Sequence, residues 1–158
     1  MPNTPHEDAS QTTLFHLGWE RFHQDSLKLS SQLKNMGHNW IGLVAITRGG
    51  LVPAMILARE LGLRKIETLS IASYDGQHQG EAHVLKNADA AMADGGQGWL
   101  VIDDLTDSGV TARLARKLLP QAFIAAVYAK PNGAPALDLF AEDIEQSVWV
   151  VFPWDDDQ

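Results

Sequence analysis

The sequence has no cysteine among its 158 residues, which excludes disulfide bonds, thiolate catalysis and cysteine metal sites. It also has no apolar run near the roughly 20 residues of a membrane-spanning helix. The amino terminus lacks a basic segment followed by an apolar one, so we expect no secretory signal there. Basic residues are few: 12 lysines and arginines stand against 20 acids, for a net charge of −8. That balance argues against binding to nucleic acid or to anionic lipid.

The chain has enough apolar residues for a core, since 45% of its residues are hydrophobic. Its length suggests one domain. We therefore expect a disordered tail over residues 1–13 and a single domain over residues 14–158.

Apolar runs and helix-like segments alternate along the chain. Segments of strand character lie at 40–47, 65–73, 99–105, 122–129 and 147–152, and segments of helical character lie at 18–36, 51–61 and 109–119. Residues 74–98 are polar and rich in glycine, which predicts a long surface loop. The alternation predicts an α/β fold with a mostly parallel central sheet flanked by helices.

The stretch "VIDDLTDSGVT" at 101–111 carries the strongest functional signal. A strand that leads through such a turn into a helix can aim several backbone N–H groups at one anion. The two preceding acids, Asp103 and Asp104, suit Mg²⁺ or the hydroxyls of a ribose, and a cation would also remove their repulsion of a phosphate. The alternative is an ordinary turn in which Asp and Ser act as caps, and it stays open.

The stretch "TRGG" at 47–50 is a second candidate site. Its glycines permit close approach of the backbone to a ligand, and Arg48 offers a planar fork of donors. The alternative is a simple Gly-Gly turn. Trp149 lies in an apolar strand, where a tryptophan is more typical of a core. The stretches "TRGG", "DDLTDSG" and "KPNG" all follow strands, and ligands of parallel sheets bind beyond such strand ends.

"VIDDLTDSGVTA" resembles the phosphoribosyl pyrophosphate (PRPP) motif of the type I phosphoribosyltransferases. "TRGGLVPAMILARELGLRKIETLSIASYD", "VYAKPNGAP" and "VWVVFPWD" resemble the xanthine-guanine branch of that family, and the resemblance runs from about Trp19 to Asp155. It implies the type I phosphoribosyltransferase fold, with a mobile hood loop from about Tyr74 to Lys86. It also implies a purine salvage enzyme that transfers ribose 5-phosphate from PRPP to N9 of xanthine, guanine or hypoxanthine and releases pyrophosphate.

The resemblance implies binding roles at the PRPP end of the site. Asp103 and Asp104 would bind the ribose hydroxyls, and Asp104 would also lie near the cofactor Mg²⁺. Arg48 and Gly49 would contact pyrophosphate through a cis peptide between them, a bond that costs ~3 kcal/mol or more outside proline. The backbone from Asp107 to Thr111 would hold the 5′-phosphate. The implied PRPP and phosphate contacts are Arg48, Gly49, Asp103, Asp104, Leu105, Thr106, Asp107, Ser108, Gly109, Val110 and Thr111.

The resemblance also implies roles at the purine end. Asp107 would be the catalytic residue, taking the proton from purine N7. Lys130 would donate to the purine O6, and Trp149 would stack on the ring. The main chain of Val150 would read the 2-substituent.

The same resemblance implies a cytoplasmic homo-oligomer, a dimer or tetramer, either free or loosely peripheral to the inner membrane. Its partners would be PRPP and the base, with no nucleic acid and no integral membrane association. Two other functions stay open. One is a phosphoribosyltransferase for another base. The other is a PRPP-sensing regulator that keeps the fold and binds RNA or DNA.

Overall fold

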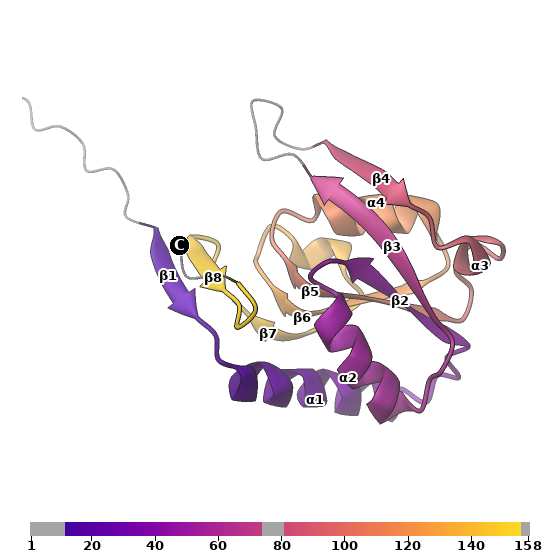
Figure 1. Cartoon of the computed structure of the whole chain (residues 1–158), viewed down its shortest axis with the longest axis horizontal. Coiled ribbons are helices and arrows are strands. Elements are labelled where there is room, and N and C mark those ends of the chain that lie inside the picture. Colours follow the sequence, from indigo (N-terminus) through magenta and orange to yellow (C-terminus); the bar gives the residue numbers. More distant parts are fainter. Residues whose placement is uncertain (1–11, 74–80, 156–158) are drawn as a thin grey trace, which may run out of the picture.

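A six-stranded sheet forms the centre of the protein in the computed structural model, which describes residues 12–73 and 81–155 (Figure 1). Its strands run in the order β4-β3-β2-β5-β6-β7. All neighbouring pairs are parallel except β3 and β4. The strands are β2 (Gly42–Thr47), β3 (Ile66–Ser73), β4 (Ala82–Lys86), β5 (Trp99–Thr106), β6 (Phe123–Ala129) and β7 (Leu139–Asp143). The predicted α/β fold with a mostly parallel sheet is confirmed.

Helices cover both faces of this sheet (Figure 1). Helices α1 (Trp19–Asn35) and α2 (Leu51–Leu61) pack on one face, and the short α3 (Asp89–Met92) and α4 (Val110–Leu118) lie on the other. Successive residues of β2 enter opposite cores: Leu43 joins the α1–α2 side and Val44 the α3–α4 side. This period of two, with both sides apolar, is why the sequence shows continuous apolar runs.

Two further strands form a separate parallel pair at one side of the molecule (Figure 1). They are β1 (Thr13–His16) and β8 (Val148–Val151), from the two ends of the described chain. The sequence predicts the second of them within 147–152 but gives no sign of the first. The pair places residues near both ends of the chain beside the carboxyl ends of β2 and β5.

Several boundaries differ from the sequence-based expectation. The predicted loop at 74–98 contains β4 and α3, and β7 was not predicted. Residues 74–80, the first part of the expected hood, lie outside the described residues, while 82–86 are the strand β4. Residues 1–11 of the expected tail are likewise not described, and β1 begins at Thr13. Within residues 12–73 and 81–155, no helix is long and apolar enough to cross a membrane.

Candidate active site

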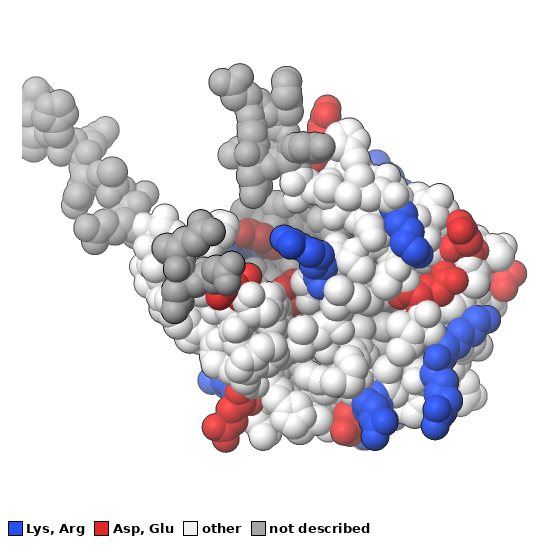
Figure 2. Space-filling model, viewed as in Figure 1, with Lys and Arg blue, Asp and Glu red and all other residues white. Residues whose placement is uncertain are grey.

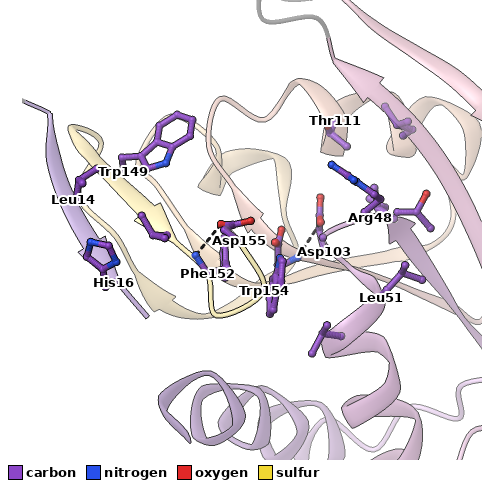
Figure 3. A pocket seen from close by; sticks show the side chains of 17 residues that line it. Leu14, His16, Arg48, Leu51, Asp103, Thr111, Trp149, Phe152, Trp154 and Asp155 are labelled. Atoms are coloured by element: carbon purple, nitrogen blue, oxygen red, sulfur yellow. Dashed lines mark hydrogen bonds between the residues drawn. The ribbon is translucent and has the colours of Figure 1, made fainter. Parts of the chain in front are cut away.

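A cavity of about 1330 Å³ opens between the carboxyl ends of β2 and β5 and the β1–β8 pair (Figure 3). This exceeds the ~300–1,000 Å³ of common ligand pockets, so two small molecules could bind side by side. Figure 3 shows Arg48, Asp103 and Thr111 on one side and Trp149 across from them on β8. The cavity is lined by Leu14, His16, Ile46, Thr47, Arg48, Gly49, Leu51, Val52, Ile71, Asp103, Asp104, Thr111, Trp149, Val151, Phe152, Trp154 and Asp155.

The turn after β2 depends on its two glycines. A Cβ at Gly49 would lie 2.5 Å from Asp104 Oδ1, and a Cβ at Gly50 would overlap the carbonyl oxygen of Ile102. The Gly-Gly pair therefore lets the end of β2 approach β5 closely, and it brings Arg48 to the cavity wall. Glycine is therefore required at both positions by packing within the protein, against the Asp104 side chain and against backbone oxygens of Ile102 and Ile46.

The expected position of the cis peptide is wrong by one residue. The cis bond joins Thr47 to Arg48, and Arg48–Gly49 is trans. Two backbone hydrogen bonds close this turn: Gly50 N–H donates to Ile46 O at 2.8 Å, and Leu51 N–H donates to Arg48 O at 3.0 Å. Arg48 therefore lies within the turn between the end of β2 at Thr47 and the start of α2 at Leu51.

Asp103 and Asp104 lie in the second half of β5 as two half-buried carboxyls that line the cavity. Burial raises the pKa of both, and the neighbouring charge of Asp104 raises the pKa of Asp103 further. Asp104 Oδ1 accepts from the N–H of Leu105 at 2.6 Å, and Asp103 Oδ1 accepts from the N–H of Asp104 at 2.9 Å. The pair is therefore an electrostatically unfavourable arrangement that a bound cation or ribose hydroxyls would relieve.

These two carboxyls fit Mg²⁺ shared with a substrate. Among residues 12–73 and 81–155, no group of three or more His, Cys, Asp or Glu side chains could hold a metal ion. Mg²⁺ is commonly bound through one or two carboxylates, with the other positions taken by water and substrate phosphates. Asp104, with Asp103 beside it, matches that donor set but would not make a complete protein site.

The turn from β5 into α4 follows the expected strand–turn–helix form. Gly109 has a φ of 84°, a conformation that favours glycine, and α4 begins at Val110. Ser108 Oγ lies 3.4 Å from the nitrogen of Val110, a long contact for a cap. Of the implied phosphate contacts, Arg48, Gly49, Asp103, Asp104 and Thr111 line the cavity. Leu105, Thr106, Asp107, Ser108, Gly109 and Val110 belong to the adjoining strand end and turn and do not line it.

Lys130 and Asp107 meet beside the cavity rather than in its wall. Lys130 is only 4% exposed at the end of β6, and its Nζ donates to Asp107 Oδ2 at 2.8 Å. The Lys130 backbone N–H donates to Thr106 O at 3.0 Å, and a Cβ at Gly133 would overlap that same oxygen. The turn that carries Lys130 is thus packed directly against the turn that carries Asp107.

Trp149 is not a core residue, because 58% of it is exposed and it lines the cavity. The next residue, Val150, has its side chain in the core. Val151 O accepts from Leu17 N–H at 2.9 Å. Because backbone groups of successive strand residues face opposite edges, the N–H and C=O of Val150 face away from β1. Val150 itself is only 6% exposed and is not among the residues that line the cavity.

Sequence reasoning missed several residues of this region. Leu14 and His16 come from β1, whose four exposed residues give no strand signal. Trp154 stacks on Phe152 with ring centroids 4.7 Å apart, and Asp155 accepts from the Phe152 N–H at 2.8 Å. Gln146 was also missed: its Nε2 donates to Asp107 Oδ1 at 2.7 Å. Among these residues, only Trp154 and Asp155 had a sequence signal, since the stretch "PWD" follows a predicted strand.

The chain matches the family model of the phosphoribosyl transferase domain over residues 18–155. It belongs to that family. Its fold is that of the type I members, with the mostly parallel sheet described above. The match covers the sheet, the helices and nearly all of the cavity.

Solved structures share this fold at low sequence identity. A purine phosphoribosyltransferase from Pyrococcus horikoshii has a TM-score of 0.74 and 21% identity, covering 92% of this chain and 96% of its own. A Neisseria gonorrhoeae hypothetical protein with bound ppGpp has a TM-score of 0.74 and 22% identity, with coverages of 92% and 91%. The xanthine-guanine-hypoxanthine phosphoribosyltransferase of Helicobacter pylori has a TM-score of 0.70 and 24% identity, with coverages of 89% and 93%.

Proposed function

We propose that this phosphoribosyltransferase transfers the 5-phosphoribosyl group of PRPP to N9 of a 6-oxopurine, giving XMP, GMP or IMP and pyrophosphate. The observation that carries the proposal is the division of the cavity: charged groups from β2 and β5 line one side, and the exposed Trp149 lines the other. The neighbours from P. horikoshii and H. pylori, whose names specify purine substrates, support the same substrate class.

PRPP would occupy the charged side. Arg48 and the backbone of Gly49 would bind pyrophosphate, and Asp103 and Asp104 would bind the ribose hydroxyls. The turn from Asp107 to Thr111 would hold the 5′-phosphate with its backbone N–H groups and the amino end of α4. Mg²⁺, when bound near Asp104, would supply positive charge that offsets the carboxylates and the phosphates.

The purine would occupy the aromatic side. Trp149 would stack on the ring, while the Val150 main chain, which faces away from β1, would contact the 2-substituent. Lys130 would donate to O6, a contact that rejects adenine because a 6-amino group presents donors instead. Asp107, already paired with Lys130, would take the proton from N7.

The reaction breaks the C1′–oxygen bond to pyrophosphate and forms the C1′–N9 bond. Negative charge develops on the leaving group, where Arg48 and neighbouring backbone N–H groups would stabilise it. The purine gains positive charge as N9 attacks, and the Asp107 carboxylate would remove the N7 proton to neutralise it. A closed cavity would also exclude water, which could otherwise attack C1′.

The direct test is nucleotide formation. The purified protein is incubated with PRPP and Mg²⁺ and with xanthine, guanine, hypoxanthine, adenine or uracil, and products are separated by chromatography. We expect monophosphates from the three 6-oxopurines and none from adenine or uracil. A product with another base alone would replace the substrate assignment, and no product with any base would contradict the proposed transfer.

A regulatory protein is the second candidate, because the N. gonorrhoeae neighbour was solved with bound ppGpp, a guanosine nucleotide that carries extra phosphates and is neither PRPP nor a free base. A regulator acting on nucleic acid would need a basic surface, yet the net charge is −8. On the face of the molecule drawn in Figure 2, the described acidic and basic side chains are interspersed and form no continuous basic patch. The nucleotide-formation assay separates the two candidates, because both would bind PRPP in calorimetry but a sensor makes no nucleotide.

We also propose a homo-oligomer, a dimer or tetramer, that acts in the cytoplasm or loosely at the periphery of the inner membrane. Light scattering after size exclusion gives the mass relative to the 17.3 kDa chain. A monomer at micromolar concentration would contradict the first part. Recovery in the membrane fraction after a salt wash would contradict the second.

A further inference from the structure

Gln146 holds the proposed proton acceptor from the side opposite to Lys130. Asp107 Oδ2 accepts from Lys130 Nζ at 2.8 Å, and Asp107 Oδ1 accepts from Gln146 Nε2 at 2.7 Å. The other end of the same amide, Gln146 Oε1, accepts from the backbone N–H of Asn132 at 2.9 Å. Three chain segments that are far apart in sequence therefore meet at one carboxylate.

The orientation of the Gln146 amide is fixed by its two partners. An ionised carboxylate only accepts hydrogen bonds and a backbone N–H only donates them. The NH₂ group must therefore face Asp107, and the carbonyl oxygen must face Asn132. A flipped amide would lose both contacts, so Gln146 joins Asp107 to the turn that carries Lys130 in one geometry.

We propose that Gln146 is a positioning residue that keeps Asp107 in place when Lys130 turns to the base. The inference rests on the proposed function. Donation from Lys130 to the purine O6 weakens its bond to Asp107 Oδ2, and that oxygen then accepts the N7 proton. Gln146 retains Oδ1, so the carboxylate does not rotate away while its other oxygen reacts.

The position of Gln146 in the chain adds a second consequence. It lies in the connection between β7 and β8, just before the strand that carries Trp149. Its bond to Asp107 therefore also sets where the proposed stacking platform lies relative to the proton acceptor. A purine placed on Trp149 would meet an Asp107 that is positioned by the same segment.

The test compares two isosteric variants with a charge control. Gln146→Glu still accepts from Asn132 but places a carboxylate against Asp107, and Gln146→Met keeps the size and loses both bonds. Ser147→Glu adds the same charge at the exposed next residue. We expect kcat to fall about 10-fold in Gln146→Met and about 100-fold in Gln146→Glu, as expected for a hydrogen bond to a charged group that is lost or reversed. The KM for the base should rise, while the KM for PRPP should stay within about twofold.

A purely structural role of Gln146 predicts a different ranking of kcat among these variants. If Gln146 only anchored the Asn132 backbone, Gln146→Glu would behave like the native protein, because its carboxylate still accepts that bond. The double variant Asp107→Asn/Gln146→Glu exchanges amide and carboxylate. We expect it to recover the thermal stability lost in Gln146→Glu without recovering kcat, since no acceptor remains at position 107.

The results distinguish failure of the proposed function from failure of the proposed role of Gln146. If the native protein makes no nucleotide, the proposed function fails and the role of Gln146 fails with it. If the native protein is active and Gln146→Glu matches it in kcat and base KM, only the role of Gln146 is overturned. If Gln146→Glu does not fold, native kcat in Gln146→Met overturns it equally.

Discussion

The two halves of the cavity are built in different ways. The PRPP half relies mainly on one continuous segment, residues 103–111, which we call the phosphate turn and which comprises a strand end, a turn and a helix start; the turn after β2 adds Arg48 and Gly49. The base half draws on the ends of β6 and β8 and on the β7–β8 connection, and these segments meet through side chains. Asp107 belongs to both halves, since its backbone lies in the phosphate turn and its carboxylate binds Lys130 and Gln146.

This difference has consequences for mutation. A local segment is held by its own backbone geometry, as the left-handed Gly109 and the start of α4 show. A site assembled from distant segments depends on each contact between them. We therefore expect substitutions in the phosphate turn to affect PRPP alone, and substitutions in the base half to affect the base, with Asp107 as the exception.

Asp107→Asn should have the largest effect. The amide keeps the shape of the side chain but cannot take a proton, and general bases typically contribute about 10²–10⁴-fold to the rate. We expect kcat to fall by about that factor while PRPP·Mg²⁺ binding, measured by calorimetry, stays near normal.

Asp104→Asn is the matched control in the phosphate turn. It should weaken PRPP and raise the Mg²⁺ concentration required, since its proposed role is ribose and metal binding. The two variants then separate into a catalytic defect and a binding defect. Native turnover by Asp107→Asn would leave Asp107 as a structural residue of the turn.

The sequence predicts the fold well where both faces of an element are covered. β2, β5 and β6 are buried on both sides and read as apolar runs, and their predicted and observed bounds differ by two residues or fewer. β1 could not be predicted, because all four of its residues are exposed and it exists through pairing with β8. β4 pairs antiparallel at the sheet edge and is largely exposed, so it reads as part of a polar loop.

The same division applies to the site. The acids and glycines of the phosphate turn are adjacent in sequence, so their chemistry is visible as a motif. Gln146 carries no such signal, because its role comes from contacts with Asp107 and Asn132, both more than ten residues away in sequence. Trp149 gave the opposite expectation: an apolar strand suggests burial, but β8 has one face open to the cavity.

Lys130→Ala should affect the base half of the cavity far more than the PRPP half. Loss of the ammonium removes the proposed donor to O6 and the partner of Asp107 Oδ2. A hydrogen bond to a charged group is worth about 1.5–3 kcal/mol, so the KM for guanine or xanthine should rise by about 10- to 100-fold. The KM for PRPP should rise far less. Steady-state kinetics with each substrate varied in turn check this, and equal effects on both KM values would contradict the assignment.

Trp149→Ala should have a smaller effect, confined to the base. Base stacking is worth roughly 1–3 kcal/mol in other proteins, so GMP should bind about 10-fold or more weakly. Trp40 is the control, since it lies outside the cavity lining and packs on His38 and Phe123. We expect Trp40→Phe to leave GMP affinity and the ligand-induced fluorescence change intact. Unchanged GMP affinity in a folded Trp149→Ala protein would remove the stacking role.

Asp103→Asn should have the smallest effect, and it should be a gain in stability. Burial and the neighbouring Asp104 raise the pKa of Asp103 in the folded protein. A carboxyl with a raised folded pKa favours the folded state below its unfolded pKa, and this contribution is lost as pH rises through the folded pKa.

At neutral pH the burial and charge repulsion of Asp103 therefore destabilise the ligand-free protein, and Asp103→Asn should raise Tm by about 2–4 °C, or ~1 kcal/mol. The gain should shrink as pH falls toward the unfolded pKa of the carboxyl, and saturating PRPP·Mg²⁺ should favour the native protein, whose ligand affinity is higher. Asp143→Asn, at the exposed end of β7, removes the same charge and should change Tm little. Calorimetric scans from pH 4.5 to about 8 measure both. A lower Tm for Asp103→Asn at pH 7 would show that the Asp103 carboxyl stabilises the ligand-free phosphate turn instead of destabilising it.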